Sequence, residues 1–166
     1  DLHKAIRRQR QMCIRDREYR VHHAVVYTND VNLSLRSRII QQYEGYESYT
    51  IIARSALVTS SSKIAGGCAL MEGAIVNGAI LAQNSVINTK AVIEHGCILG
   101  NNVFVGPGAI VCGDTCIGDN VLVGAGVIIR DGIEITENVT IGMGSVVVRS
   151  IVEPGVYLGN PCRKIR

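Results

Sequence analysis

The most regular feature of the chain is a six-residue repeat of aliphatic side chains. From Leu81 to Val147, every sixth residue is Leu, Ile or Val, in twelve consecutive hexads. Four residues after each of these comes a second compact residue, such as Ala91 or Cys97, and Gly, Asn and Asp fill many positions between. This period is typical of a β-helix, in which each hexad supplies one short strand and one turn, and three hexads make one triangular coil. The repeat therefore predicts two inward-facing residues per hexad that stack along the axis of a prism.

The repeat extends upstream with one irregularity. The hexad Val76–Ile80 is one residue short, and ahead of it the six-residue step continues. With the short hexad included, seventeen hexads fill nearly six coils and predict a β-helix over residues 52–152. The sequence EPG at 153–155 then interrupts the period, so residues 153–166 are predicted to form a C-terminal tail. The aliphatic residues ahead of the short hexad are Ile52, Val58, Ile64 and Leu70.

Two segments precede the repeat. Residues 1–20 hold seven basic and three acidic residues and form a basic extension, whose MCIRDR run resembles a translated sequencing adapter. That resemblance favours a non-native origin for part of the extension, so it carries no functional argument. Residues 21–51 contain β-forming stretches at 21–28 and from residue 48, separated by helical apolar spacing between Leu33 and Tyr43. This pattern predicts one βαβ unit.

Charge and composition argue against several classes of function. The net charge of +3 lies in the basic extension, since residues 21–166 hold ten basic and eleven acidic residues, and nucleic-acid binding is therefore not expected. No apolar run approaches the length of a membrane span, and no secretory signal precedes the repeat, which predicts a cytoplasmic protein. The six cysteines include no CxxC pair, and Cys68 and Cys97 fall on inward positions, so neither a metal site nor a disulfide is predicted.

Two stretches of the repeat carry a specific resemblance to a known family. They are VINTKAVIEHGCILGNNVFVGPGAIVCGDTCIGDNVLVGAGVII at 86–129 and GVYLGNPCRKI at 155–165. The chain resembles, over residues 21–166, the hexapeptide-repeat acetyltransferases of the sialic-acid O-acetyltransferase and UDP-amino-sugar N-acetyltransferase group. The resemblance implies an all-β, left-handed parallel β-helix behind a Rossmann-like substrate domain, of which residues 21–51 look like a remnant because its Gly-rich first turn is missing. It also implies a homotrimer that uses acetyl-CoA to acetylate an amino or hydroxyl group of a sugar or nucleotide-sugar.

His95 is the candidate general base of such a reaction. It is the only His in the predicted β-helix, and it takes the third position of the hexad IEHGCI, on an outward corner. A neutral imidazole can accept a proton from an amine or hydroxyl and later return it to the CoA thiolate. The resemblance places the catalytic His of the family here and, in many members, an acidic residue directly after it. In this chain Gly96 follows His95 and Glu94 precedes it, so Glu94 is the candidate acidic partner.

Four residues are candidates for contact with acetyl-CoA. Gly113 follows His95 by one coil, so the two should lie on the same corner, and a glycine there leaves space for a thioester. The resemblance carries over the other three, Phe104, Ala125 and Met143. Phe104 stands where some members have a second His, and because Phe cannot donate a hydrogen bond to an oxyanion, a backbone N–H would have to do so.

Two other classes of protein share the repeat. A β-helix can serve as a trimeric assembly module without chemistry, and this alternative stays open because most of the substrate domain is not recognisable. A metal enzyme of the γ-carbonic-anhydrase type needs three His ligands for each metal ion, which one His in the repeat does not supply. Acetyl transfer is therefore the leading hypothesis, with no metal.

Overall fold

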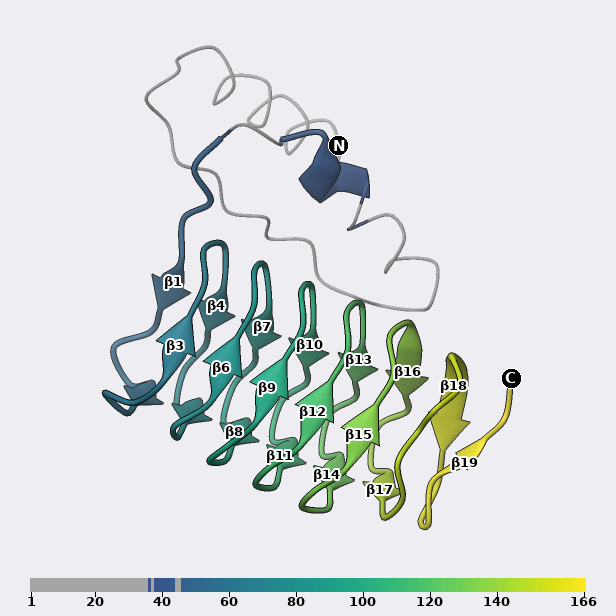
Figure 1. Ribbon diagram of the computed structural model, residues 1–166. Helices are drawn as coiled ribbons and strands as arrows, with labels where there is room; N and C mark the ends of the chain where they lie inside the picture. The colour runs from purple at the N-terminus through teal and green to yellow at the C-terminus, as the bar shows by residue number, and fades with distance from the viewer. Residues whose placement is uncertain (1–35, 37, 44–45) are drawn as a thin grey trace, which may run out of the picture.

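The computed structural model describes residues 36, 38–43 and 46–166. Residues 51–147 form seventeen short strands, β1 to β17, that wind into a left-handed parallel β-helix with a triangular cross-section (Figure 1). The predicted all-β fold is therefore confirmed. The predicted strand at 21–28 and part of the predicted helix lie outside the described residues. In the described part of that helix, residues 36 and 38–41 are helical. None of the described helices has the length and apolarity to cross a membrane.

Three parallel sheets form the walls of the prism. The first sheet has eight strands, the second has six and the third has five. The first contains β1 (Ile51–Ile52), β4 (Ala69–Leu70), β7 (Val86–Ile87), β10 (Phe104–Val105), β13 (Leu122–Val123), β16 (Val139–Ile141), β18 (Gly155–Leu158) and β19 (Arg163–Lys164). The second contains β2 (Leu57–Val58), β5 (Ile75–Val76), β8 (Val92–Ile93), β11 (Ile110–Val111), β14 (Ile128–Ile129) and β17 (Val146–Val147). The third contains β3 (Lys63–Ile64), β6 (Ile80–Leu81), β9 (Ile98–Leu99), β12 (Cys116–Ile117) and β15 (Glu134–Ile135).

The predicted inward positions make up the core. The twelve aliphatic residues of the repeat are each at most 3 % exposed, and the compact residues that accompany them are buried as well. Each stacks on its counterpart one coil away, as Val105 does on Ile87 and Val123. Because every inward side chain in the middle coils has neighbours above and below, only compact apolar residues fit along the axis.

The first coil differs from the coils above it. Ile52 and Val58 occupy inward positions of the repeat, yet they are 50 % and 36 % exposed. The strands that carry them, β1 and β2, are the first in their sheets and pair on one side only, with β4 and β5. An inward residue at the end of a stack therefore loses half of the neighbours that bury its counterparts.

The C-terminal segment closes the other end of the prism. After the repeat, β18 pairs in parallel with β16, and β19 returns antiparallel to β18. Tyr157 packs against the core and donates a hydrogen bond from its hydroxyl to the carbonyl of Glu153 at 2.9 Å. The segment leaves the six-residue period, as predicted, but it also extends the first sheet. It therefore acts as a cap over the last coil.

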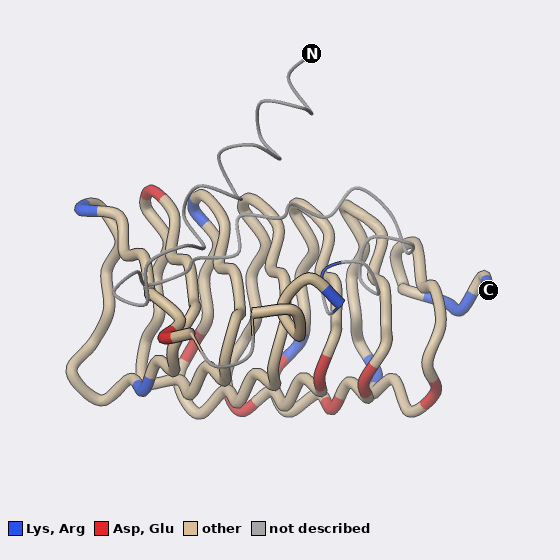
Figure 2. Tube along the Cα trace, turned by 90° about the horizontal axis from the view of Figure 1, so that it is seen from above, with Lys and Arg blue, Asp and Glu red and all other residues tan. Residues whose placement is uncertain are grey.

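Three lines of turns form the corners of the prism. The first corner joins the first sheet to the second, the second corner joins the second sheet to the third, and the third corner returns to the first sheet. Figure 2 shows that most charged residues of the β-helix lie along these corners. On the strands of the second and third sheets, only Lys63 and Glu134 carry charge. The flat faces of these two sheets are therefore mainly apolar.

Candidate active site

His95 lies on the second corner, in the turn between β8 and β9, and its side chain is exposed. Gly113 occupies the same corner one coil later and is buried. A Cβ added to Gly113 would lie 2.6 Å from His95 Cε1 and 2.9 Å from Nε2. The imidazole therefore packs directly on the Gly113 backbone. The space that was expected to receive a thioester is filled by the imidazole ring itself, because the side chain leans toward the following coil.

Glu94 lies next to His95 and is half-buried. Its Oε2 accepts a hydrogen bond from the side-chain amide of Asn77, one coil earlier, at 3.0 Å. This hydrogen bond restricts the rotation of the carboxylate. It holds the Glu94 side chain toward the preceding coil, whereas the imidazole of His95 leans toward the following one. Sequence reasoning did not find Asn77, because the short hexad hides its position relative to Glu94.

A second carboxylate lies on the same corner. The side chain of Asp114 folds back over Gly96, so that its Oδ1 occupies the place where a side chain of residue 96 would begin. Gly96 and Asp114 both have positive φ angles, of 69° and 57°, and they are stacked one coil apart. Asp114 thus places a second carboxylate next to the residue that follows His95. The eighteen-residue step from 96 to 114 was the signal that could have identified it.

The cysteines near His95 are not suited to nucleophilic chemistry. Burial raises the pKa of the Cys97 thiol, and the carboxylates of Asp114 and Glu94 raise it further. Burial likewise raises the pKa of Cys112, where Asp131 and Glu94 add to the effect. A raised pKa keeps a thiol protonated and unreactive near neutral pH. Among the described residues, no group of three His, Cys, Asp or Glu could hold a metal ion.

The candidate acetyl-CoA contacts fall on different parts of the prism. Gly113 shares the second corner with His95, whereas Ala125 and Met143 lie on the first corner, where Met143 is 76 % exposed. Phe104 lies on the outward side of the first sheet, between Val86 and Leu122, and is 8 % exposed. One chain therefore does not bring these residues together. The outer face of the second sheet separates the corner of His95 from the corner of Ala125 and Met143.

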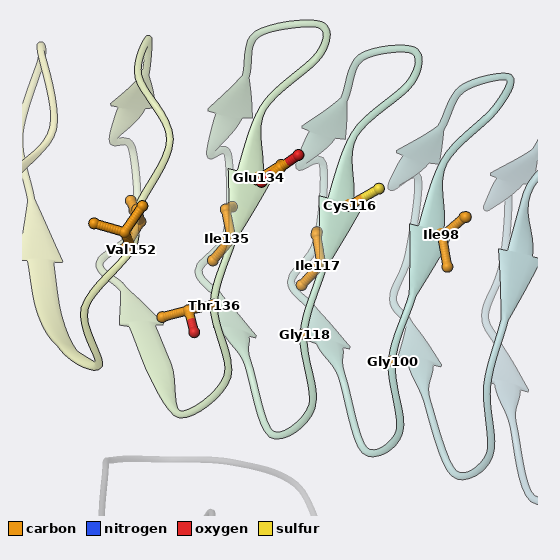
Figure 3. A pocket seen from close by; sticks show the side chains of 10 residues that line it. Ile98, Gly100, Cys116, Ile117, Gly118, Glu134, Ile135, Thr136 and Val152 are labelled. Carbon is orange, nitrogen blue, oxygen red and sulfur yellow. The ribbon is translucent and has the colours of Figure 1, made fainter.

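A shallow groove of about 450 Å³ runs along the outer face of the third sheet (Figure 3). Ile98, Cys116 and Glu134 form a column on this face, and Thr136 and Val152 lie beside its C-terminal end. The groove contains none of the predicted site residues. It is therefore a feature of the exposed face and is separate from the corner that carries His95.

Comparisons with known proteins agree with the β-helical fold. Residues 114–149 match the family "Bacterial transferase hexapeptide (six repeats)". The acetyltransferase domain of PglB from Neisseria gonorrhoeae is similar with a TM-score of 0.78 and 31% identity, over 81% of this chain and 67% of that domain. Perosamine N-acetyltransferase from Caulobacter crescentus, solved with CoA and GDP-perosamine, gives a TM-score of 0.78 and 27% identity, over 81% of this chain and 65% of the enzyme.

A further structure of the PglB domain, in complex with acetyl coenzyme A, gives a TM-score of 0.75 and 25% identity, over 89% of this chain and 84% of that chain. No curated protein sequence matches the chain significantly. The protein belongs to the hexapeptide-repeat acetyltransferases. It spans about two thirds of the length of the first two structures.

Proposed function

We propose that the protein transfers an acetyl group from acetyl-CoA to an amino or hydroxyl group of a sugar or nucleotide-sugar, with His95 as general base. The observation that carries this proposal is the exposed imidazole on the second corner, held against Gly113, with Glu94 as its neighbour in the sequence. Support comes from the similar structures, which contain acetyl coenzyme A, or CoA together with GDP-perosamine. A cytoplasmic location fits an enzyme that draws on acetyl-CoA.

The reaction uses His95 twice. As the acceptor nitrogen or oxygen attacks the thioester carbonyl, the imidazole takes the proton that the acceptor loses. The tetrahedral intermediate then collapses, the carbon–sulfur bond breaks, and the imidazolium returns the proton to the CoA sulfur. Glu94 is the neighbour of His95 in the sequence, and its negative charge would favour the imidazolium that forms during this interval. A backbone N–H near the thioester would stabilise the oxyanion, since Phe104 cannot donate a hydrogen bond.

We further propose that the active protein is a homotrimer with acetyl-CoA bound between neighbouring β-helices. His95 lies on one corner, whereas Ala125 and Met143 lie on another, so a single chain cannot present all three to one molecule. The outer face of the second sheet exposes apolar side chains, among them Ile110 at 38 % and Ile128 at 43 %. Extended apolar faces of this kind mark protein interfaces.

The assembly is tested by mass measurement in solution. The parent should have three times the mass of one chain at micromolar concentration. Ile110→Asp would place a charge on the outer face of the second sheet, so it should dissociate the trimer while each chain keeps its β-sheet circular dichroism. A parent that stays monomeric at this concentration would overturn the proposed assembly.

The activity is tested with the complete polypeptide, acetyl-CoA and a panel of acceptors. The panel contains free hexosamines and UDP- and GDP-linked amino sugars, including GDP-perosamine, and mass spectrometry detects an added acetyl group. His95→Ala should lower kcat by about a hundredfold to ten-thousandfold, the usual contribution of a general base, while CoA affinity and the melting temperature stay close to those of the parent. An acetylating parent whose kcat does not change in His95→Ala would exclude the base assignment. No acetylation by the parent would favour an assembly module instead.

A further inference from the structure

The short hexad Val76–Ile80 changes the second corner directly beside His95. A full corner has four residues between its strands, such as 94–97, but this corner has only Asn77, Gly78 and Ala79. The Gly96 N–H donates to the Gly78 carbonyl at 3.2 Å, as the Asp114 N–H does to the His95 carbonyl one coil later, and Asn77 bonds Glu94. Gly78 therefore takes the place of His95 in the hydrogen-bond ladder, so the residue one coil before His95 is a glycine, in a corner that is one residue short.

Hydroxyl groups replace the backbone ladder at this point. In later coils the corner N–H bonds a backbone carbonyl, as Asp114 does with His95 at 2.8 Å. At the short corner, the Gly78 N–H instead donates to Thr59 Oγ1 at 2.7 Å and to Ser62 Oγ at 2.9 Å. The Ser62 hydroxyl in turn donates to the Val76 carbonyl at 3.1 Å. The shortened turn is thus fully bonded to the coil below it and is a stable part of the fold.

As a result, the described residues stack no side chain at Gly78, on the N-terminal side of His95. The backbone there belongs to Gly78, where an added Cβ would lie 4.0 Å from His95 Cβ and 3.3 Å from Ser61 Oγ. On the opposite side the imidazole packs against Gly113 and leaves no space. Besides the hydroxyls that bond its N–H, the polar groups around Gly78 include the exposed Ser61 hydroxyl and the half-buried pair of Asn77 and Glu94.

We infer that the acceptor approaches His95 across the short corner, and that Ser61 and Asn77 help to determine which acceptor is used. This inference rests on the proposed function and deepens it. A hydroxyl both donates and accepts, an amide does the same, and a carboxylate accepts, which together suit the adjacent hydroxyl groups of a sugar ring. A sugar ring held over Gly78 presents its amine or hydroxyl to the imidazole. The short corner, which has a glycine one coil before His95, therefore leaves room for the ring.

The decisive variant inserts one Ser between Asn77 and Gly78 and so restores a six-residue hexad. The fold should be kept, because the other corners of the repeat have this length. The inserted residue would lie beside His95, so kcat/KM for the acceptor should fall by at least about a hundredfold, as for other small misplacements of reacting groups. The dissociation constant for CoA should not change. One Ser inserted between Thr136 and Glu137, on the third corner, controls for insertion itself and should leave kcat/KM unchanged.

If the insertion variant does not fold, two single substitutions test the same inference. Ser61→Ala should raise KM for the acceptor about threefold to tenfold, which is the usual effect of losing one hydrogen bond to a ligand, with little change in kcat. Ser60→Ala is the matched control on the same turn and should match the parent. Unchanged KM in Ser61→Ala, or unchanged kcat/KM in a folded insertion variant, overturns the inference while the parent's acetylation upholds the proposed function. A parent that acetylates no acceptor of the panel overturns both.

Discussion

The axis of the prism and its second corner differ in how strongly packing restricts their residues. Along the axis the same kinds of residue recur in coil after coil, and from Leu81 onward the inward aliphatic residues are almost completely buried. Along the corner the residue changes with each coil, through Gly78, His95, Gly113 and Asp131. An axial side chain is packed from above and below, whereas a corner side chain faces solvent and is not confined by the core. The repeat therefore maintains the fold along the axis and leaves the corner free to carry chemistry.

The largest effect is expected from a charge placed on the axis. Val123 is fully buried, so Val123→Asp would place an unpaired carboxylate among apolar side chains, at a cost of several kcal/mol that should abolish folding. Leu122→Asp, at the outward neighbour on the same strand, should cost much less. Thermal melting followed by circular dichroism compares the two. Equal melting temperatures for Val123→Asp and the parent would show that the inward register is wrong.

A methyl group placed on the corner should affect activity far more than stability. Gly113→Ala would bring a Cβ within 2.6 Å of His95 Cε1, so the imidazole has to move. A displacement of about 1 Å at a reacting group can cost about a hundredfold in rate, and we expect kcat to fall by this order with little change in melting temperature. Asp131→Ala, one coil further along the same corner, is the control and should match the parent. Parent-like kinetics in Gly113→Ala would show that the contact with the ring has no catalytic consequence.

A smaller effect is expected from the carboxylate beside His95. Glu94→Gln keeps the shape of the side chain and removes its charge, so kcat should fall about threefold to tenfold without a change in CoA affinity. Asn77→Ala frees the Glu94 side chain, and its effect on kcat should be weaker still. Steady-state kinetics at saturating acetyl-CoA measures both. If Glu94→Gln matches the parent while Asp114→Asn lowers kcat, the second carboxylate on this corner is the one that acts on the imidazole.

The smallest effect concerns thiol chemistry. Cys97 points along the axis and its pKa is raised by burial, so less thiolate is present at any given pH than for an ordinary cysteine. Cys116 lies on the outer face of the third sheet and is exposed. Iodoacetamide at pH 8 should therefore label Cys116 in the native protein and leave Cys97 unmodified until the protein is unfolded. Peptide mass spectrometry locates the label, and labelling of native Cys97 would contradict its axial position.

The sequence by itself determined the architecture. The six-residue period places each inward residue, including Leu81 and Val147 at the ends of the uninterrupted run, and the structure buries both. The eighteen-residue step likewise places Gly113 one coil after His95. These predictions hold because, in a β-helix, the position of a residue within its six-residue repeat determines which residues it stacks on. A periodic sequence shows that position directly.

The tertiary structure decided how side chains are directed at the second corner. The imidazole leans onto Gly113, Asp114 folds back over Gly96, and the hydroxyls of Thr59 and Ser62 bond the shortened turn. None of these contacts follows from the period, because each depends on positive-φ turns and on side chains that meet from neighbouring coils. A corner side chain has several directions open to it, and contacts between coils select one, whereas an axial side chain has only the space that the stack leaves.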